Sequence, residues 1–567
     1  MSTHARPLAD WLAAASDAEL ADLFAARGIR ADAPWHDFFD AAEALLEPAS
    51  LARMLPQLTL REAIGLRSAA DGVDAGAERA GLTALALLRP DGTPYPPVLA
   101  VVAGLQIPTD AGGDPPTPAS AENAAHAAER AFTTVTSLAD LLLHARETPL
   151  ALLATGGISA GEKRLLAEAG VPAESIDALL GIAVDADLVR ADGRKLRVSA
   201  DTEHWLHAGV GDRWGRLAMG FLRALPRGLR RDAAGWPDLS VWPNAHPWDP
   251  TWPDRCAVLL ERARLLGLIA DDGSEPDWTV PLRERGEVDA EALTGVLPAE
   301  VDRIFLQNDL SAIAPGPLAP ALDVRLRTIA ARESAAQASS YRFTVESIAH
   351  ALASGETEDS ILEFLGSLSL TGIPQPLSYL IVQTAQRHGL VRVSADAATG
   401  RTRIDSVDGH LIDAMAVDQT LRPLALSRVG ASLASRVGRD TVYWALTDAR
   451  YPATLVGADG TVLTADRHPA TTGPVAVIAD YSPLLARLRA QQGPDADAAW
   501  LDRELEAAVR AKAVLQVTVG MPDGSTRDLL LEATGLGGGR LRGRDRAADV
   551  ERTLPVSSIR AAFVVEQ

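Results

Sequence analysis

The lysines of this chain show whether it can carry the nucleotide site of an ATPase. The sequence contains only three of them, Lys163, Lys195 and Lys512. A P-loop lysine follows a glycine and precedes Ser or Thr, because the glycine lets the backbone approach the phosphates and the hydroxyl holds magnesium. None of the three fits: at the nearest candidate, Glu162 precedes Lys163 and Arg164 follows it. We interpret this segment as a loop that opens a helix, with Ser159 as its N-cap and Glu162 completing a capping box.

Other catalytic and metal-binding patterns give no positive signal. The sequence has no H-E-x-x-H, G-x-S-x-G, EF-hand, Rossmann or protein-kinase motif. Its single cysteine, Cys256, excludes disulfides within the chain and thiolate-based zinc or iron–sulfur sites. His204 and His207 could share a metal with Glu203, but we interpret them as surface or packing residues. We therefore expect no enzymatic activity, no cofactor and no metal; a hydrolase or nuclease whose carboxylates form no sequential motif is the remaining enzymatic alternative.

Clustered cations suit one kind of chemistry, contact with phosphate groups. The candidate nucleic-acid-binding residues form three groups: Arg190, Arg194, Lys195 and Arg197; Arg223, Arg227, Arg230 and Arg231; and Arg540, Arg542, Arg544 and Arg546. Each group has an alternative interpretation, respectively a solvated hairpin edge, a helix C-terminus whose dipole the cations satisfy, and arginines neutralised by nearby acids. Because the net charge is −21, only such local patches could meet nucleic acid.

The first cation group lies on a predicted β-hairpin that follows an amphipathic helix. Apolar residues at 176, 179, 180, 183 and 184 have helical spacing, and residues 188–198 predict two strands around Asp192-Gly193. This order outlines a winged helix, and looser copies begin near residues 259 and 377. The helix from Ser175 to Asp187 carries three acids and no cation, so we expect it to be a poor DNA reader, whereas the hairpin suits phosphate contact.

The length of 567 residues is several times what one hydrophobic core serves, so we expect several packed units. We predict an α+β fold, mainly helical, with tandem winged-helix-like modules and a small β-rich C-terminal domain. The expected units are a helical or degenerate winged-helix domain (1–105), a winged-helix domain (123–232), a Trp/Pro connector with a second winged-helix-like module (233–298), a fourth unit (299–410), a small α/β module (411–485) and the β-rich domain (500–567). The connector's tryptophans are expected to pack across a domain junction.

Residues 301–393 carry an ordered set of short motifs. These are Ile304-Phe305-Leu306-Gln307, Tyr341-Arg342-Phe343-Thr344, Gly355, the 361–369 helix and Ile373-Pro374-Gln375-Pro376. The set resembles the domain that precedes the motor in XPB-type DNA-repair helicases and recurs in bacterial helicase-associated proteins; the resemblance implies a region that helps to engage DNA and to position the motor. From the residues themselves, Thr344 is expected to cap a helix that begins at Val345, and residues 361, 364, 365 and 368 to form one buried stripe.

Residues 501–567 predict a helix followed by short strands. The helix spans Leu505–Lys512, the strands span 514–519 and 527–532, and a closing segment follows at 555–559. This order resembles the WYL domain that often follows winged helices in bacterial regulators, which implies ligand sensing. The Trp-Tyr-Leu signature is absent, and the arginine-rich residues 539–546 stand in its place. The resemblance is therefore to a degenerate, WYL-like domain.

These observations predict a non-enzymatic, DNA-associated accessory or scaffold protein without a helicase motor, which docks a helicase, repair or transcription partner. The alternative is a winged-helix and WYL-type, ligand-responsive transcription regulator. No stretch approaches the ~20 apolar residues that span a bilayer, and the first residues lack a secretory pattern. We therefore expect a cytoplasmic protein with no membrane partner.

Overall fold

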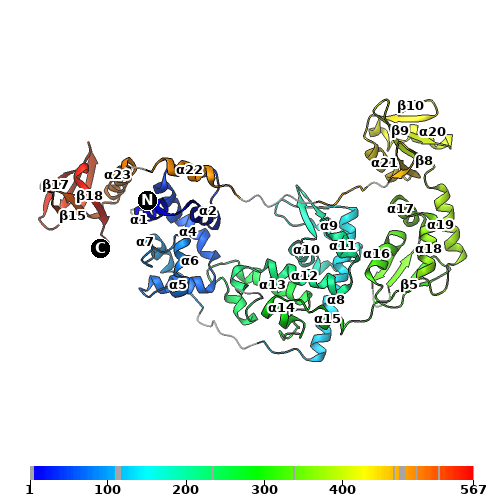
Figure 1. Cartoon of the computed structure of the whole chain (residues 1–567), viewed down its shortest axis with the longest axis horizontal. Helices are drawn as coiled ribbons and strands as arrows, with labels where there is room; N and C mark the ends of the chain where they lie inside the picture. Colours follow the sequence, from blue (N-terminus) through cyan, green and yellow to red (C-terminus); the bar gives the residue numbers. More distant parts are fainter. Residues whose placement is uncertain are drawn as a thin grey trace.

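The computed structural model describes residues 5–108, 116–231, 235–335, 339–463, 466–471, 479–492, 494–521 and 524–565. Within these residues, five hydrophobic clusters define five bodies of an extended molecule. The C-terminal body lies at one end, beside the N-terminal body (Figure 1). The predicted fold class, α+β and mainly helical with a small β-rich C-terminal part, is confirmed. None of the described helices combines the length and the apolar character that crossing a membrane requires.

The N-terminal body is a helical assembly. Its helices are α1 (Arg6–Ala14), α2 (Asp17–Ala26), α3 (Phe38–Leu46), α4 (Pro48–Met54), α5 (Leu60–Ala70), α6 (Arg79–Ala84) and α7 (Pro96–Val102). Capping boxes at Ser16 and Thr59 begin α2 and α5, since each side chain accepts from the backbone three residues on. Aromatic residues such as Phe24 and Phe38 fill the core.

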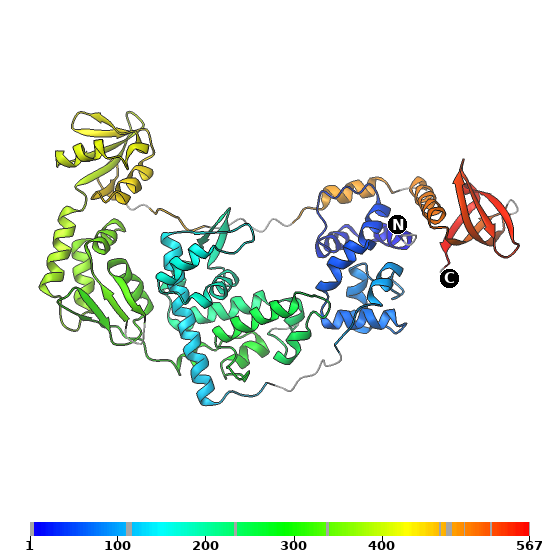
Figure 2. The same cartoon turned by 180° about the vertical axis from the view of Figure 1, so that it is seen from behind.

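Two helices from the far end of the sequence complete this N-terminal core. They are α22 (Ser482–Ala490) and α23 (Pro494–Ala511), and both views place α22 against the N-terminal helices (Figures 1 and 2). The Tyr481 ring meets Phe24 edge-on, with centroids 5.8 Å apart. The Trp500 ring is buried, and its Nε1 donates to Asp37 at 3.2 Å. The two ends of the sequence therefore share one hydrophobic core.

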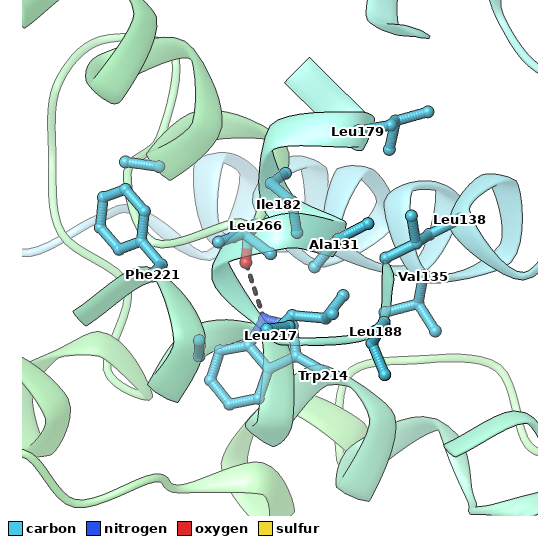
Figure 3. Packing of buried hydrophobic residues seen from close by; sticks show 14 of the residues in the cluster. Ala131, Val135, Leu138, Leu179, Ile182, Leu188, Trp214, Leu217, Phe221 and Leu266 are labelled. Atoms are coloured by element: carbon cyan, nitrogen blue, oxygen red, sulfur yellow. Dashed lines mark hydrogen bonds between the residues drawn. The ribbon is translucent and has the colours of Figure 1, made fainter. Parts of the chain in front are cut away.

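The central body is built around one long helix. Its elements are α8 (Ala121–Glu147), β1 (Leu150–Ala151), α9 (Ala160–Glu168), α10 (Ile176–Asp185), β2 (Val189–Asp192), β3 (Lys195–Val198), α11 (Thr202–His207), α12 (Val210–Ala224), α13 (Trp252–Leu265), α14 (Thr279–Arg285) and α15 (Ala290–Thr294). Figure 3 shows its core, in which the Trp214 Nε1 donates to the Leu266 carbonyl at 2.8 Å. The predicted helix at 176–184 and the hairpin around Asp192-Gly193 are both present.

The tryptophans of the connector pack across the junction of these two bodies, as expected. Trp242 and Trp252 lie in the central core, whereas Trp248 lies in the N-terminal one, where its Nε1 donates to the Gln106 carbonyl at 2.9 Å. The backbone N–H of Leu60 also reaches across, to a connector carbonyl at 2.9 Å. Apolar burial and hydrogen bonds thus hold the two bodies together.

The third body combines a four-stranded sheet, in the order β4-β5-β7-β6, with four helices among the described residues. Its elements are β4 (Phe305–Leu306), β5 (Ser311–Ala314), α16 (Pro320–Ile329), β6 (Ala331–Ala335), β7 (Ser339–Arg342), α17 (Val345–Ala353), α18 (Glu358–Leu368) and α19 (Gln375–Arg387). The Thr344 side chain caps α17 by accepting from the Ser347 N–H at 3.1 Å, as predicted. The predicted stripe on α18 is buried.

The fourth body contains a six-stranded sheet in the order β10-β11-β9-β8-β12-β13. Its elements are β8 (Val391–Asp396), β9 (Arg401–Ser406), α20 (Gly409–Val417), β10 (Ser427–Val429), β11 (Ser432–Ser435), α21 (Arg439–Asp448), β12 (Ala453–Val456) and β13 (Val462–Leu463). The hairpin β8–β9 directly follows α19, so the chain passes from the third body into this sheet without a long linker.

The C-terminal body is a five-stranded antiparallel sheet that packs against the end of α23. Its strands are β14 (Val514–Gly520), β15 (Thr526–Gly537), β16 (Arg540–Asp545), β17 (Val550–Pro555) and β18 (Ile559–Val564). All neighbours are antiparallel, in the order β17-β16-β15-β14-β18. Alternate residues of β14, such as Leu515 and Val517, enter the core.

Candidate nucleic-acid interface

The first cation group lies on the hairpin β2–β3, where two of its four members are paired. The Arg190 guanidinium donates to Asp187 through Nε at 2.6 Å and through Nη2, and this hydrogen bonding holds the pKa of Asp187 below its usual value. Arg197 forms an ion pair with Asp192 across the hairpin, 3.2 Å from Nε to Oδ2. These two charges are therefore compensated locally.

Arg194 and Lys195 are the open cations of the hairpin. Gly193 adopts φ +59°, which allows the tight turn and leaves the two side chains exposed at the tip. Among the described residues, no carboxylate lies within ion-pair distance of either one. A pair of uncompensated cations on a protruding turn is suited to contact with phosphate oxygens.

A segment from much later in the sequence lies at the base of this hairpin. The Thr471 N–H donates to the Val198 carbonyl at 3.1 Å, and Ser199 and Thr471 form a parallel bridge. Burial lowers the pKa of His468, and the nearby cations Arg467, Lys195 and Arg197 lower it further. The hairpin is therefore anchored at its base and open at its tip.

The second cation group is divided among different roles. The Arg227 Nη2 donates to Glu62 of the N-terminal body at 2.7 Å, and the Arg230 guanidinium donates to the carbonyls of Leu225 and Arg223 at the end of α12. The guanidinium groups of these two residues therefore make structural contacts within the protein. Arg223 and Arg231 are exposed, and Arg223 lies close enough to the base of the β2–β3 hairpin to lower the pKa of Asp187.

The third cation group forms a stripe along the outer face of β16. Arg540, Arg542 and Arg544 are exposed and alternate with the buried Leu541 and Gly543, as the two-residue period of a strand requires. Asp549 pairs with Arg544 at 2.7 Å, and Glu532 lies 3.8 Å from the Nε of Arg546. Only one end of the stripe is therefore close to acids.

The other end of this stripe is flanked by residues without a charged side chain. On β15, Gly535 lies opposite Arg542 and Gly537 lies opposite Arg540. On β17, Thr553 and Pro555 hold the corresponding positions. The two guanidinium groups therefore have no acid directly opposite them on either neighbouring strand and are accessible to an extended phosphate backbone.

The structure does not bring the three groups onto one body. Both views place the N-terminal body between the C-terminal strands and the central body that carries the hairpin (Figures 1 and 2). A ligand that contacts both uncompensated pairs, Arg194 with Lys195 and Arg540 with Arg542, would have to be long, as a nucleic acid is. Among the described residues, no group of three His, Cys, Asp or Glu side chains is placed to hold a metal ion.

Sequence reasoning missed a buried ion network that joins the central and third bodies. The Asp140 carboxylate on α8 accepts from Arg327 of α16 at 2.6 Å and from Arg332 of β6. The partners lie 187 and 192 residues away along the chain. A lone acid in an amphipathic helix carries no signal for such distant partners.

Comparison with known protein families identifies one match. The model of the helicase conserved C-terminal domain matches residues 304–430, which comprise the third body and the fourth as far as β10. This match supports the helicase relation inferred for this region. The curated proteins contain no significant match to the chain.

The helicase match corrects the expectation that the chain is not an enzyme. That expectation rested on the absence of a P-loop lysine and of other catalytic motifs. Helicases are enzymes, so a helicase-family domain at residues 304–430 conflicts with it. The physical reason is that a motif search tests only for a nucleotide site of one known form, and the rest of a helicase carries no such signature.

Proposed function

We propose that this chain binds the backbone of DNA through two open cation pairs while its helicase-related region acts in a helicase, repair or transcription assembly. The observation that carries the proposal is the uncompensated charge of Arg194 and Lys195 at the hairpin tip and of Arg540 and Arg542 on β16. The match at 304–430 supplies the helicase context. The acidic remainder of the chain, with a net charge of −21, disfavours phosphate contact outside local cation patches and suits a basic protein partner.

We further propose that the central body presents its hairpin as the wing of a winged helix. The element order α8, β1, α9, α10, β2 and β3, with strand order β1-β3-β2, supports this assignment. The third body is proposed to correspond to the XPB-type N-terminal-like domain, and residues 500–567 to a WYL-like domain. A helix followed by five described strands supports the latter. The domain boundaries and the alternative of a ligand-responsive regulator stay predictions.

Titration of DNA at several salt concentrations tests the proposal. Fluorescence anisotropy of short fork, single-stranded and duplex DNA gives the slope of log affinity against log salt concentration, which reports the phosphates contacted. Replacing Arg194 and Lys195 by Gln should lower that slope by about 2 for duplex DNA, because each lost contact removes roughly 0.9. The same exchange at Arg540 and Arg542 should have a comparable effect.

The matched control removes equal charge elsewhere. Arg30 and Arg53 are exposed on the N-terminal body, and their double replacement by Gln should leave the slope unchanged. Equal slopes in all variants would refute the two patches as DNA contacts. ATP hydrolysis is followed in the same samples, because a helicase relation makes turnover stimulated by DNA an expected property of the assembly.

A further inference from the structure

Helix α19 is the last of three consecutive helices in the third body and leads directly into the hairpin β8–β9. Leu377, Ile381 and Thr384 form its buried side, which packs on α17 and α18. The helix thus holds the same place in the order of elements that α10 holds before the hairpin β2–β3. Both views place α19 at the outer edge of the molecule (Figures 1 and 2).

The outward side of α19 is a single stripe of exposed side chains, named here the α19 face. Its members are Gln375, Tyr379, Gln383, Gln386 and Arg387. Their spacing of three or four residues aligns them along one side of the helix. The Tyr379 side chain is 62% exposed, and its hydroxyl accepts from the Gln383 amide at 2.5 Å. The stripe is therefore exposed, and a hydrogen bond joins two of its members.

The charge of α19 differs from that of α10. The sequence of α19 contains no Asp or Glu, and its one charged residue is Arg387. In contrast, α10 carries Asp177 and Asp185, and the Asp185 carboxylate is tied to Arg262 of α13 at 2.8 Å. Because α12 and α13 also pack on α10, only Asp177 and Val184 are exposed along that helix, whereas the five side chains of the α19 face are exposed.

We infer that the α19 face reads base edges in the major groove of duplex DNA. A helix fits this groove, where Gln pairs with adenine through two hydrogen bonds and Arg pairs with guanine in the same way. A tyrosine ring offers apolar contact to a thymine methyl group. The absence of carboxylates on the helix avoids repulsion from the flanking phosphates, and Arg392 on β8, five residues beyond the end of α19, is a further exposed cation.

The composition of the face favours DNA over a protein partner. Protein-docking helices bury an apolar stripe, whereas this one presents three amides, a guanidinium and a single aromatic ring. The inference shares with the proposed function only the premise that the chain binds DNA. It adds a site that discriminates between sequences, while the open cation pairs contact phosphates without regard to sequence.

Selection from a pool of randomised duplexes, using the full chain, tests this inference. The wild-type chain should enrich a short motif. The variant Gln383→Ala with Arg387→Ala should lose about 25-fold or more of its preference for that motif over unrelated duplex, since each of the two base contacts contributes about 5-fold or more. Its salt slope should fall by no more than about 1. In addition, Gln383→Glu should change the preferred base at one position toward cytosine, whose amino group a carboxylate accepts from.

Arg53 and Gln57 provide a matched control, because they are an exposed Arg and Gln four residues apart on another body. Their replacement by Ala should leave the motif intact. The variant of Arg194 and Lys195 should weaken binding to every duplex and still select the same motif. Salt-dependent binding by the wild-type chain with no enriched motif, or a motif indifferent to the α19 variants, would overturn this inference alone. No binding to any DNA at low salt would overturn the proposed function as well.

Discussion

Removing the charge of Asp140 should loosen the junction between the central and third bodies. The Asp140 side chain is 2% exposed, and its partners Arg332 and Arg327 are 9% and 16% exposed. In Asp140→Asn the shape is kept, but two buried guanidinium groups lose their carboxylate. Breaking a buried ion pair from one side typically costs about 3–5 kcal/mol. Because Arg327 retains Asp323 at 3.7 Å, we expect the lower end, about 3 kcal/mol.

Hydrogen exchange measures this cost where it arises. A loss of about 3 kcal/mol from local opening corresponds to roughly 100-fold faster exchange. The acceleration should be confined to amides of α16, β6 and the facing part of α8, and should leave the C-terminal body unchanged. The control is Asp177→Asn, whose carboxylate pairs with Lys163 but is 71% exposed and should contribute at most about 1 kcal/mol.

The reasoning would be refuted if exchange in α16 and β6 rose no more in Asp140→Asn than in Asp177→Asn. That outcome would mean that apolar packing alone holds the junction. A global rise across all bodies would also contradict it, because the network touches only two of them.

Two further predictions concern buried contacts elsewhere. Burial raises the pKa of Glu504 to about 7 although the Arg6 guanidinium lies 3.5 Å away, so the folded state favours the protonated acid. The free energy of unfolding should therefore increase as pH falls from 7 toward 4.5. At pH 8, Glu504→Gln should raise the free energy of unfolding by about 2 kcal/mol, measured from the shift of the unfolding midpoint. Identical pH profiles for both chains would contradict this. Gly267 adopts φ +65°, and an added Cβ would lie 2.4 Å from the Ala127 carbonyl oxygen. Gly267→Ala should cost about 2–4 kcal/mol in thermal unfolding, clearly more than Gly273→Ala, where φ is +85° but nothing lies within 4 Å; equal losses would assign the cost to backbone strain alone.

Local patterns predicted the local structure well. The apolar spacing at 176–184, the Asp192-Gly193 turn, the Thr344 cap and the buried stripe on α18 all depend on residues within one or two turns of each other. The side-chain period of a strand likewise explains why Arg540 and Arg542 lie on the outside of β16. Such signals depend only on residues that are near one another in the sequence, so a single sequence is enough to detect them.

Long-range contacts were not predictable in the same way. An amphipathic helix such as α22 shows that one side will be buried but not that its partner is a core about 450 residues earlier. The accessibility of a helix has the same limit. Helices α10 and α19 hold equivalent places in sequence order, yet α8, α12 and α13 pack on α10, whereas α17 and α18 pack on one side of α19 and leave its other side exposed. Cation patches could be named from sequence, whereas the pairing of Arg227 with Glu62 required the fold.

The shared core of the two ends has a consequence for synthesis on the ribosome. Tyr481, Trp500 and the leucines of α22 complete a hydrophobic core whose remaining residues, apart from Trp248, are made within the first 107 positions. At about 5–20 residues per second, roughly 20–80 s pass between the emergence of the first part and that of the last. During this interval the nascent N-terminal helices expose the apolar surface that α22 and α23 will cover. A chaperone that shields that surface should therefore increase the yield of folded chain more than one that acts after release.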